Sequence, residues 1–307
     1  MKVAVLASFV GQTIVLPISQ YIAIYYISPN ILLLQYFFVC SKLTVYDFKQ
    51  EGDFMPAGLF NLSSIEQIIR LEEINSTNLY AKSHLDEIND KTVICTDKQT
   101  SGRGRFGRAW FDLGEGNIFM SLVLKPYEDF KPLYANLTQY FSVILCEILE
   151  EYGLKPQIKW PNDVLVDGKK IAGILSETVM QGHNFKGLVL GAGINLNAKS
   201  DDLKQITDKE VTALNLEIGQ FVDKHIFLDK LMNRFFENYD KFLEQGFVMI
   251  EQDYIKRACF LGKEISVKDF NNTISGLAKS INSAGEIILE RDGNDITVTI
   301  GDILWNN

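Results

Sequence analysis

The chain has 307 residues and a formal net charge of −9. This length is enough for one large domain or two smaller ones with a substantial core. The acidic balance argues against a general nucleic-acid-binding protein, which would carry a basic face, so we expect no nucleic-acid partner. Cysteines and histidines are dispersed without metal-ligand spacing, which argues against a zinc site or a disulfide framework and indicates a reducing compartment, the cytoplasm. They are Cys40, Cys95, Cys146, Cys259, His84, His183 and His225.

Residues 1–54 form an apolar N-terminal segment that can be interpreted in two ways. Residues 3–41 include no charged side chain, and a spanning helix needs about 20 apolar residues. The segment is therefore either a membrane anchor or uncleaved signal, flanked by Lys2, or the result of a start assigned too early, with translation beginning at Met55. Glutamines and prolines such as Pro17 interrupt the apolar pattern. Membrane contact is expected only if the segment is genuine.

The next part of the chain predicts helices alternating with strands. Residues 61–85 predict a short helix, a strand-like turn and a second helix whose N-cap lies in the stretch NSTN. Strands are predicted at 92–97 and 117–124, because both runs are rich in β-branched and apolar residues. Apolar residues at helical spacing predict a helix over 133–149, which Gly153 ends.

The second half of the chain continues this mixture and then changes in texture. Two strands flank Asp167-Gly168, a dipeptide typical of two-residue hairpins, and residues 185–197 predict another apolar strand. Residues 226–246 predict one amphipathic helix. From residue 258 onward short strands alternate with turns, which predicts a separate small β-barrel of about fifty residues.

The stretch TDKQTSGRGRFGRAW begins in the strand predicted at 92–97 and continues into a segment rich in glycine and arginine. We call this segment, residues 102–110, the arginine loop. Its glycines match the dinucleotide fingerprint G-x-G-x-x-G, but that fingerprint requires a helix after the loop. Here RAWFDLGEGNIF leads into a strand, so we reject it. Instead, Arg103, Arg105 and Arg108 on a flexible backbone can bind phosphate or carboxylate oxygens. A solvated surface loop, or a segment that contacts RNA, remains the alternative at this point.

A second cation-bearing segment has the sequence KWPND and begins at Lys159. This lysine lies between an isoleucine and a tryptophan, which is an unusual place for a solvated side chain. A salt-bridged lysine beside a Pro-Asn-Asp turn is the simpler explanation of this segment taken alone. The combination of segments decides between the two.

Four segments together resemble the catalytic module of the biotin protein ligases. They are EINSTN, GRGRFGRAW, KWPNDVLVDGKKIAGILSE and GLVLGAGINLN, and VTALNLEIG follows them. They occur in the order and with the separations that are typical of that family. The resemblance implies an α+β fold: a class II aminoacyl-tRNA synthetase-like catalytic domain over 63–257, with a mixed sheet and helices, and an SH3-like β-barrel over 258–307. Residues 1–62 lack the pattern of a DNA-binding helix-turn-helix, so the resemblance is to the enzyme-only type.

The resemblance implies a ligase that uses ATP to attach biotin, through biotinyl-5′-AMP, to a lysine of a biotin carboxyl carrier protein, the carrier subunit of a carboxylase. ATP and biotin would be substrates. Mg²⁺ would enter with ATP and be held mostly by phosphates and water, so we expect no side-chain metal ligands. Family members often pair through sheet edges, so a homodimer is a further expectation.

The resemblance also assigns roles to particular residues. Lys159 would contact both the biotin carboxylate and the α-phosphate, and Arg103 and Arg105 would close over the adenylate. Arg108 would help to bind phosphate, and Trp110 would form a flat wall near the adenine, although core packing explains Trp110 almost as well. Asn195 would reach the nucleotide. The biotin-binding set is Ser76, Thr77, Asn78, Gln99, Arg103, Gly104, Arg105, Lys159, Gly173 and Gly193, with Gly191 keeping the cavity floor open.

Two rival functions remain open on the sequence. A lipoate or octanoate ligase shares the catalytic fold and the lysine, but KWPND would be unexpected in it. A non-catalytic protein that binds biotin or RNA is a rival of another class. One departure from the family pattern is Phe106, which stands where some relatives have a further arginine, so the electrostatics of the arginine loop are expected to be weaker here.

Overall fold

In the computed structural model the chain forms two compact units, Met1–Pro56 and Ala57–Asn307, which we describe separately. The structure describes residues 4–9, 12–17, 21–28, 31–38, 67–114, 116–126, 129–270 and 272–305.

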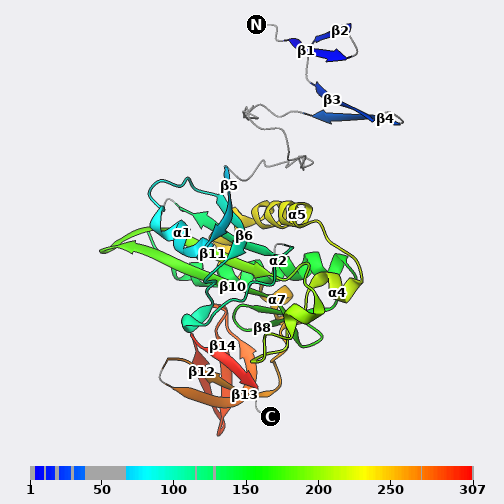
Figure 1. Ribbon diagram of the computed structural model, residues 1–307. Helices are drawn as coiled ribbons and strands as arrows, with labels where there is room; N and C mark the ends of the chain where they lie inside the picture. Colours follow the sequence, from blue (N-terminus) through cyan, green and yellow to red (C-terminus); the bar gives the residue numbers. More distant parts are fainter. Residues whose placement is uncertain are drawn as a thin grey trace. The chain divides into compact units, whose positions relative to one another are not determined.

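The described parts of the first unit are two antiparallel hairpins (Figure 1). Strand β1 (Ala4–Phe9) pairs with β2 (Gln12–Pro17), and β3 (Tyr21–Ser28) pairs with β4 (Ile31–Phe38). None of the helices in the part of the chain that the structure describes is long and apolar enough to cross a membrane. The proposed start at Met55 lies outside the described residues, as does much of residues 1–62, in which the sequence lacks a helix-turn-helix pattern.

The second unit is built on a seven-stranded mixed sheet in the order β5-β6-β7-β11-β10-β9-β8 (Figure 1). Strands β5 and β6 are parallel, and the other neighbours pair antiparallel. This mixed sheet confirms the predicted α+β fold. The strands are β5 (Gln67–Ile74), β6 (Thr92–Gln99), β7 (Ile118–Leu124), β8 (Pro156–Lys159), β9 (Asp163–Val166), β10 (Lys169–Gln181) and β11 (Asn184–Ile194).

Strand predictions based on local chemistry are confirmed. The predicted strands at 92–97, 117–124 and 185–197 correspond to β6, β7 and β11. Between β9 and β10, Asp167 and Gly168 adopt φ values of 48° and 78°, as a two-residue hairpin of this type requires.

Helix α2 (Leu137–Glu151) covers one face of the sheet and packs against β8, β9 and β10. It is preceded by a 3-10 turn, η2 (Pro132–Asn136), and followed by Gly153 at φ 82°. The predicted helix and its end are confirmed. The other helical segments are α1 (Thr77–Ser83), η1 (Arg105–Gly107), α3 (Ser200–Leu203), α4 (Leu214–Ile218), α5 (Lys224–Glu237), α6 (Tyr239–Gln245), η3 (Gly246–Met249) and α7 (Glu251–Arg257).

Two predicted helices differ from the structure. The first helix predicted in residues 61–85 is wrong over Gln67–Ile74, because these residues pair with β6 as strand β5. Sheet pairing overrides the local helical pattern there. The helix predicted over 226–246 is two helices, α5 and α6, because Asn238 leaves the helical region at φ −124° and ψ 12°.

The C-terminal strands form a five-stranded antiparallel sheet in the order β15-β14-β13-β12-β16. It corresponds to the predicted small barrel and is consistent with an SH3-like domain, while the boundary placed at residue 258 stays a prediction. Figure 1 shows this sheet beside the end of the larger sheet that carries β8. The strands are β12 (Glu264–Lys268), β13 (Thr273–Ile281), β14 (Ile287–Arg291), β15 (Asn294–Val298) and β16 (Asp302–Trp305).

Hydrogen bonds attach the turn between β13 and β14 to the first sheet and α2. Asn136 Nδ2 donates to the Ala284 carbonyl at 2.8 Å, and Gln139 Nε2 donates to the Gly285 carbonyl at 2.8 Å. The indole nitrogen of Trp160 donates to the same Gly285 carbonyl at 3.0 Å. Because these donors are buried, the two sheets are held in a defined arrangement by bonds that are costly to break.

We predict that Trp160→Phe lowers the stability of the second unit while its ring packing is kept. The variant removes the indole donor to Gly285 and leaves that carbonyl with one bond fewer, which costs about 1 kcal/mol, or a fall of about 2–4 °C in the melting temperature of a domain of this size. Differential scanning calorimetry measures this shift. Trp305→Phe, on an indole that is 40% exposed, is the control. Equal melting temperatures for the Trp160 variant and the parent would contradict the prediction.

Candidate active site

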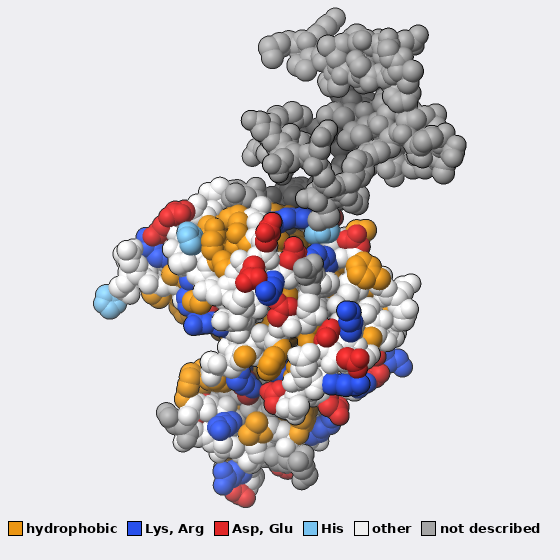
Figure 2. Space-filling model, viewed as in Figure 1, with side chains coloured by type: hydrophobic (Ala, Val, Ile, Leu, Met, Phe, Trp, Pro, Cys, Tyr) orange, Lys and Arg blue, Asp and Glu red, His pale blue; other side chains and the backbone are white. Residues whose placement is uncertain are grey.

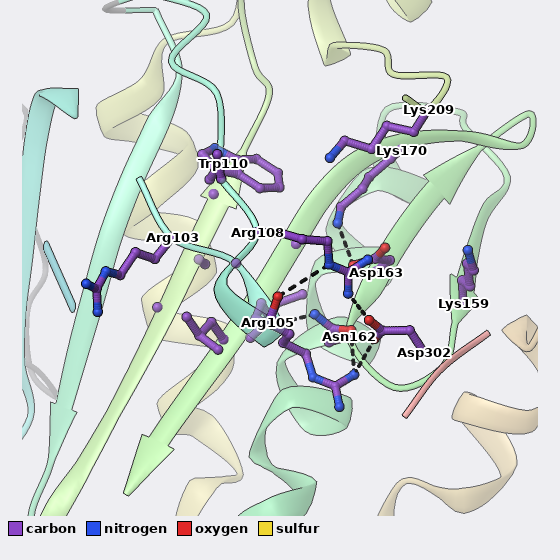
Figure 3. A pocket seen from close by; sticks show the side chains of 18 of the residues that line it. Arg103, Arg105, Arg108, Trp110, Lys159, Asn162, Asp163, Lys170, Lys209 and Asp302 are labelled. Carbon is purple, nitrogen blue, oxygen red and sulfur yellow. Dashed lines mark hydrogen bonds and ion pairs between the residues drawn. The ribbon is translucent and has the colours of Figure 1, made fainter. Parts of the chain in front are cut away.

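A cavity of about 480 Å³ lies at the junction of the arginine loop, the large sheet and the C-terminal sheet, and we call it the central cavity (Figure 3). It brings together residues that the sequence spreads over more than 200 positions. The predicted site residues that line it are Ser76, Thr77, Asn78, Gln99, Arg103, Gly104, Arg105, Arg108, Trp110, Lys159, Gly173, Gly191 and Gly193.

The arginine loop is a short hairpin-like excursion after β6. Arg103 and Ala109 form an isolated antiparallel bridge, and the backbone N–H of Gly104 donates to the Arg108 carbonyl at 2.7 Å. Glycine is required at position 102, because a Cβ there would lie 2.5 Å from the Trp110 carbonyl oxygen. The loop leads into β7, not into a helix, which agrees with our rejection of the dinucleotide fingerprint.

The loop is anchored to the C-terminal sheet by charge. Arg105 Nη1 donates to Asp302 Oδ1 at 2.8 Å and to the Gly301 carbonyl at 2.9 Å, and Arg108 forms an ion pair with the same carboxylate (Figure 3). Burial lowers the pKa of Arg105 to about 10, and nearby Asp163 opposes the shift. Guanidinium groups predicted to bind substrate oxygens therefore face a protein carboxylate in this conformation.

An aromatic contact anchors the tip of the loop. Phe106 adopts a positive φ of 53°, and its ring meets Phe270, which follows β12, edge-on at 4.6 Å between centroids. The Arg105 guanidinium lies 5.0 Å from the Phe106 ring. The phenylalanine that departs from the family pattern thus connects the loop to the C-terminal sheet.

The predicted cations share the cavity without all pointing to one spot. Figure 3 shows Arg103 directed away from Arg105 and Lys159. Lys159, at the end of β8, places Nζ 5.5 Å from the Trp305 ring, and burial lowers its pKa against the opposing effect of Asp163. The cations therefore line one cavity, but each of them contacts different side chains.

Lys170 lines this cavity, and sequence reasoning did not single it out. Its Nζ lies 2.6 Å from Asp163 Oδ1 and 5.3 Å from the Trp110 ring centroid. Burial lowers the pKa of Lys170, and the Asp163 carboxylate opposes this. Lys170 belongs to the stretch DGKKIAG quoted above. The face of β10 on which its side chain lies depends on a register shift between Lys170 and Ala172, which the sequence does not reveal.

Trp110 forms one wall of the cavity and packs on glycines of the sheet. A Cβ at Gly193 would lie 2.3 Å from the indole, and one at Gly173 would lie 2.8 Å from it. These glycines therefore leave room for the tryptophan as well as for a ligand. The indole nitrogen is buried and has no hydrogen-bond partner among the described residues, so the protein leaves this donor unsatisfied.

The opposite end of the cavity is polar and buried. The Thr77 backbone N–H, at the start of α1, donates to Gln99 Oε1 at 2.9 Å. Ser76 is the N-cap residue, yet its side chain makes no capping bond within the described region. Gln99, from β6, thus satisfies the helix end, and simple capping does not account for Ser76. Ser121 lies behind this group with its hydroxyl 2.8 Å from Thr77 Oγ1.

Asn195 is placed differently from the expectation. It is not among the described residues that line the central cavity. Its Nδ2 donates to the Thr212 carbonyl at 3.0 Å, and its backbone N–H donates to the Ile171 carbonyl at 2.9 Å. A direct nucleotide contact by Asn195 finds no support in this geometry, because the side chain ties the segment of Thr212 to the sheet.

Comparisons with known proteins identify the family of this chain. A sequence model of the Biotin/lipoate A/B protein ligase family matches residues 70–195. A biotin–acetyl-CoA-carboxylase ligase of Paracoccus denitrificans is 30% identical over 227 residues, which are 71% of this chain and 92% of that protein. The chain belongs to the biotin protein ligase family.

Two further relatives show the extent of the family likeness. The bifunctional ligase/repressor BirA of Bacillus spizizenii is 32% identical over 200 residues, so the chain spans about 61% of the length of that relative. The biotin protein ligase of Aquifex aeolicus, solved in complex with biotin and ATP, aligns with a TM-score of 0.65 and 28% identity over 78% of this chain and 98% of that one.

We predict that Asp302→Ala exposes the arginine loop to trypsin. The variant lacks the carboxylate that pairs with Arg105 and Arg108, so the loop opens more often. Trypsin cleavage after the arginines of the loop should then become about tenfold faster. Peptide mass analysis of a cleavage time course measures the rate. Asp295→Ala is the matched control, because its carboxylate pairs with Lys279 on the exposed side of the C-terminal sheet. Equal rates in both variants would show that Asp302 does not anchor the loop.

Proposed function

We propose that this protein uses ATP to activate biotin as biotinyl-5′-AMP and then transfers biotin to a lysine of a biotin carboxyl carrier protein. The observation that carries the proposal is the central cavity. One cavity is lined by arginines and lysines from several segments, and it has a tryptophan wall and a buried polar end. Family membership supports the same reaction class.

The chemistry explains why this site needs cations. In the first step a biotin carboxylate oxygen attacks the α-phosphorus of ATP, and pyrophosphate leaves. In the second step the amine of the carrier lysine attacks the acyl carbon, loses a proton and releases AMP. Both steps bring negative oxygens together or spread charge over them, so positive groups fixed around the cavity stabilise the transition states.

Lys170 is the best-placed cation for the joining step. It is buried between Asp163 and the face of Trp110, and Figure 3 shows its ammonium directed toward Asp163. Lys159 lies toward Trp305 and the C-terminal sheet. We therefore assign Lys170 to the biotin carboxylate and α-phosphate, and Lys159 to the nucleotide phosphates. This assignment moves the central role expected for Lys159 to a lysine eleven positions later.

The other residues divide into two groups. Arg105 and Arg108 would exchange Asp302 for phosphate oxygens as the loop closes over the adenylate, while Arg103 covers the biotin side. Trp110 would support the adenine with the face of its ring. Mg²⁺ would enter with ATP, held mostly by phosphate oxygens and water.

The polar end of the cavity favours biotin over lipoate or octanoate. Gln99, Thr77 and Ser121 gather oxygen atoms within hydrogen-bond distance of one another at a buried position. A cyclic urea offers N–H and carbonyl groups that can bond to this polar end in addition to the bonds that its side chains make with one another, whereas a dithiolane or an alkyl chain offers it no polar group. The rival acyl ligase therefore fits this cavity less well.

A transfer assay separates the competing functions. The purified protein is incubated with ATP, labelled biotin and a biotin carboxyl carrier domain, and label on the carrier is measured. We expect covalent label that depends on ATP and on the acceptor lysine. Transfer of octanoate or lipoate in place of biotin would establish the rival ligase, and biotin binding without transfer would establish a non-catalytic binding protein.

We predict that Lys170→Ala reduces biotinyl-AMP formation more than Lys159→Ala does. Removing the cation assigned to the biotin carboxylate and α-phosphate should lower the rate of adenylate formation by about 100-fold or more, because a fixed positive charge beside the reacting oxygens is lost. Pyrophosphate release in single-turnover experiments measures the step. Lys263→Ala, whose Nζ lies 5.3 Å from the outer Trp305 ring, is the control. A larger effect for Lys159→Ala would return the central role to Lys159.

We also predict that biotin binding weakens at alkaline pH earlier than an ordinary lysine would allow. Burial lowers the pKa of Lys170 and Lys159 below the usual value of about 10.4, so each ammonium is lost at a lower pH. The charged form attracts the biotin carboxylate, and affinity therefore falls as pH rises through the lowered pKa. Calorimetric titrations over pH measure this. Biotinol, which lacks the carboxylate, should show a flat profile, and parallel profiles for both ligands would contradict the prediction.

A further inference from the structure

Asn78 lines the polar end of the central cavity, and its neighbours dictate how its amide is oriented. The side-chain nitrogen donates to Glu177 Oε2 at 2.9 Å and to the Leu175 carbonyl at 3.3 Å. A carboxylate and a backbone carbonyl can only accept hydrogen bonds. Both amide hydrogens of Asn78 are therefore directed at β10, and the amide cannot be reversed without placing its oxygen against two other oxygens.

The amide oxygen of Asn78 consequently faces the other way. Asn78 Oδ1 accepts a hydrogen bond from Ser121 Oγ at 2.6 Å. It also lies directly over Gly191, which lines the cavity, because a Cβ at Gly191 would come within 2.1 Å of it. A carbonyl oxygen has two acceptor positions and Ser121 uses one. Asn78 thus offers the cavity an acceptor and has no hydrogen left to donate.

Glu177 holds this arrangement from outside the cavity. It is absent from the described residues that form the cavity wall. Its second carboxylate oxygen, Oε1, lies 2.7 Å from Lys82 Nζ, one turn along α1 from Asn78. The side chains of Glu177 and Lys82 are 24% and 33% exposed, so the pair is partly shielded from water. One carboxylate of β10 therefore binds two side chains on the same face of α1.

We propose that Glu177 is a positioning residue that makes the polar end of the cavity an acceptor and so selects ligands with a ring N–H. The inference rests on the proposed function, in which the ligand head is a cyclic urea. Glu177 touches no substrate; it acts through Asn78. Without the carboxylate, the Asn78 amide can rotate by 180°, which points N–H groups at the ligand's N–H and removes the favourable contact.

The first test measures binding of the ligand head alone. Biotinol retains the urea ring and lacks the carboxylate, so its affinity reports on the polar end and not on the lysines. We expect Glu177→Ala to weaken biotinol binding by about tenfold or more in calorimetry, because a buried acceptor contact becomes a clash of donors. Glu73→Ala, which also removes a glutamate that pairs with a lysine at 2.7 Å, is the matched control and should bind as the parent does.

A rescue experiment separates orientation from simple loss of an ion pair. In Glu177→Gln, the Lys82 ammonium can only donate, so it attracts the oxygen of the new amide and leaves the amide nitrogen facing Asn78. Two donors then oppose each other, and biotinol binding should fall. Adding Lys82→Met releases that oxygen to accept from Asn78, and affinity should return to within about twofold of Lys82→Met alone. An ion-pair role would instead make the double variant no better than Glu177→Gln.

The outcomes distinguish this inference from the proposed function. If the parent protein binds neither biotin nor biotinol, the proposed function fails. If the parent binds both and Glu177→Ala binds biotinol equally well, the role of Glu177 is wrong and the proposed function stands. Glu177→Gln, alone or combined with Lys82→Met, retains a polar side chain at position 177, so this comparison gives an answer even if Glu177→Ala does not fold. Failure of Lys82→Met to restore binding to Glu177→Gln would also overturn the inference.

Discussion

Positive charge buried beside a cavity is the constraint on which this site depends. Ammonium and guanidinium groups removed from water are costly unless a carboxylate pairs with them. Asp163 supplies that partner for Lys170, and Asp302 supplies it for Arg105 and Arg108. Burial lowers the pKa of Arg105 and of Lys170, and Asp163 opposes the shift in both cases. A substrate rich in negative oxygens would relieve the same imbalance.

The C-terminal sheet is part of the site because it supplies one of those carboxylates. Asp302 is separated from Arg105 by nearly two hundred positions, yet both line the central cavity. The contact of Phe106 with Phe270 adds an apolar attachment at the tip of the same loop. On the face drawn in Figure 2, Lys and Arg side chains are interspersed with Asp and Glu. The concentration of cations in the arginine loop is therefore a local feature.

Sequence-based predictions were correct for features that depend on only a few neighbouring residues. The hairpin at Asp167 and Gly168 and the end of α2 at Gly153 follow from backbone preferences that need no distant partner. The strand β5 was mistaken for a helix because its pairing with β6 is a property of the sheet. The break at Asn238 was missed because the apolar periodicity continues across it.

The sequence by itself indicated many of the chemical groups that line the site, through its resemblance to the biotin protein ligases. The glycines and arginines of the loop, the lysine before Trp160 and the polar residues at the start of α1 could all be read without a structure. Only the tertiary structure decided which lysine lies against Trp110, since a register shift in β10 redirects Lys170. It also decided the partner of the arginines and the orientation of Asn78, because Asp302 and Glu177 approach from strands distant in the chain. Side-chain direction depends on such long-range contacts, and sequence spacing does not encode them.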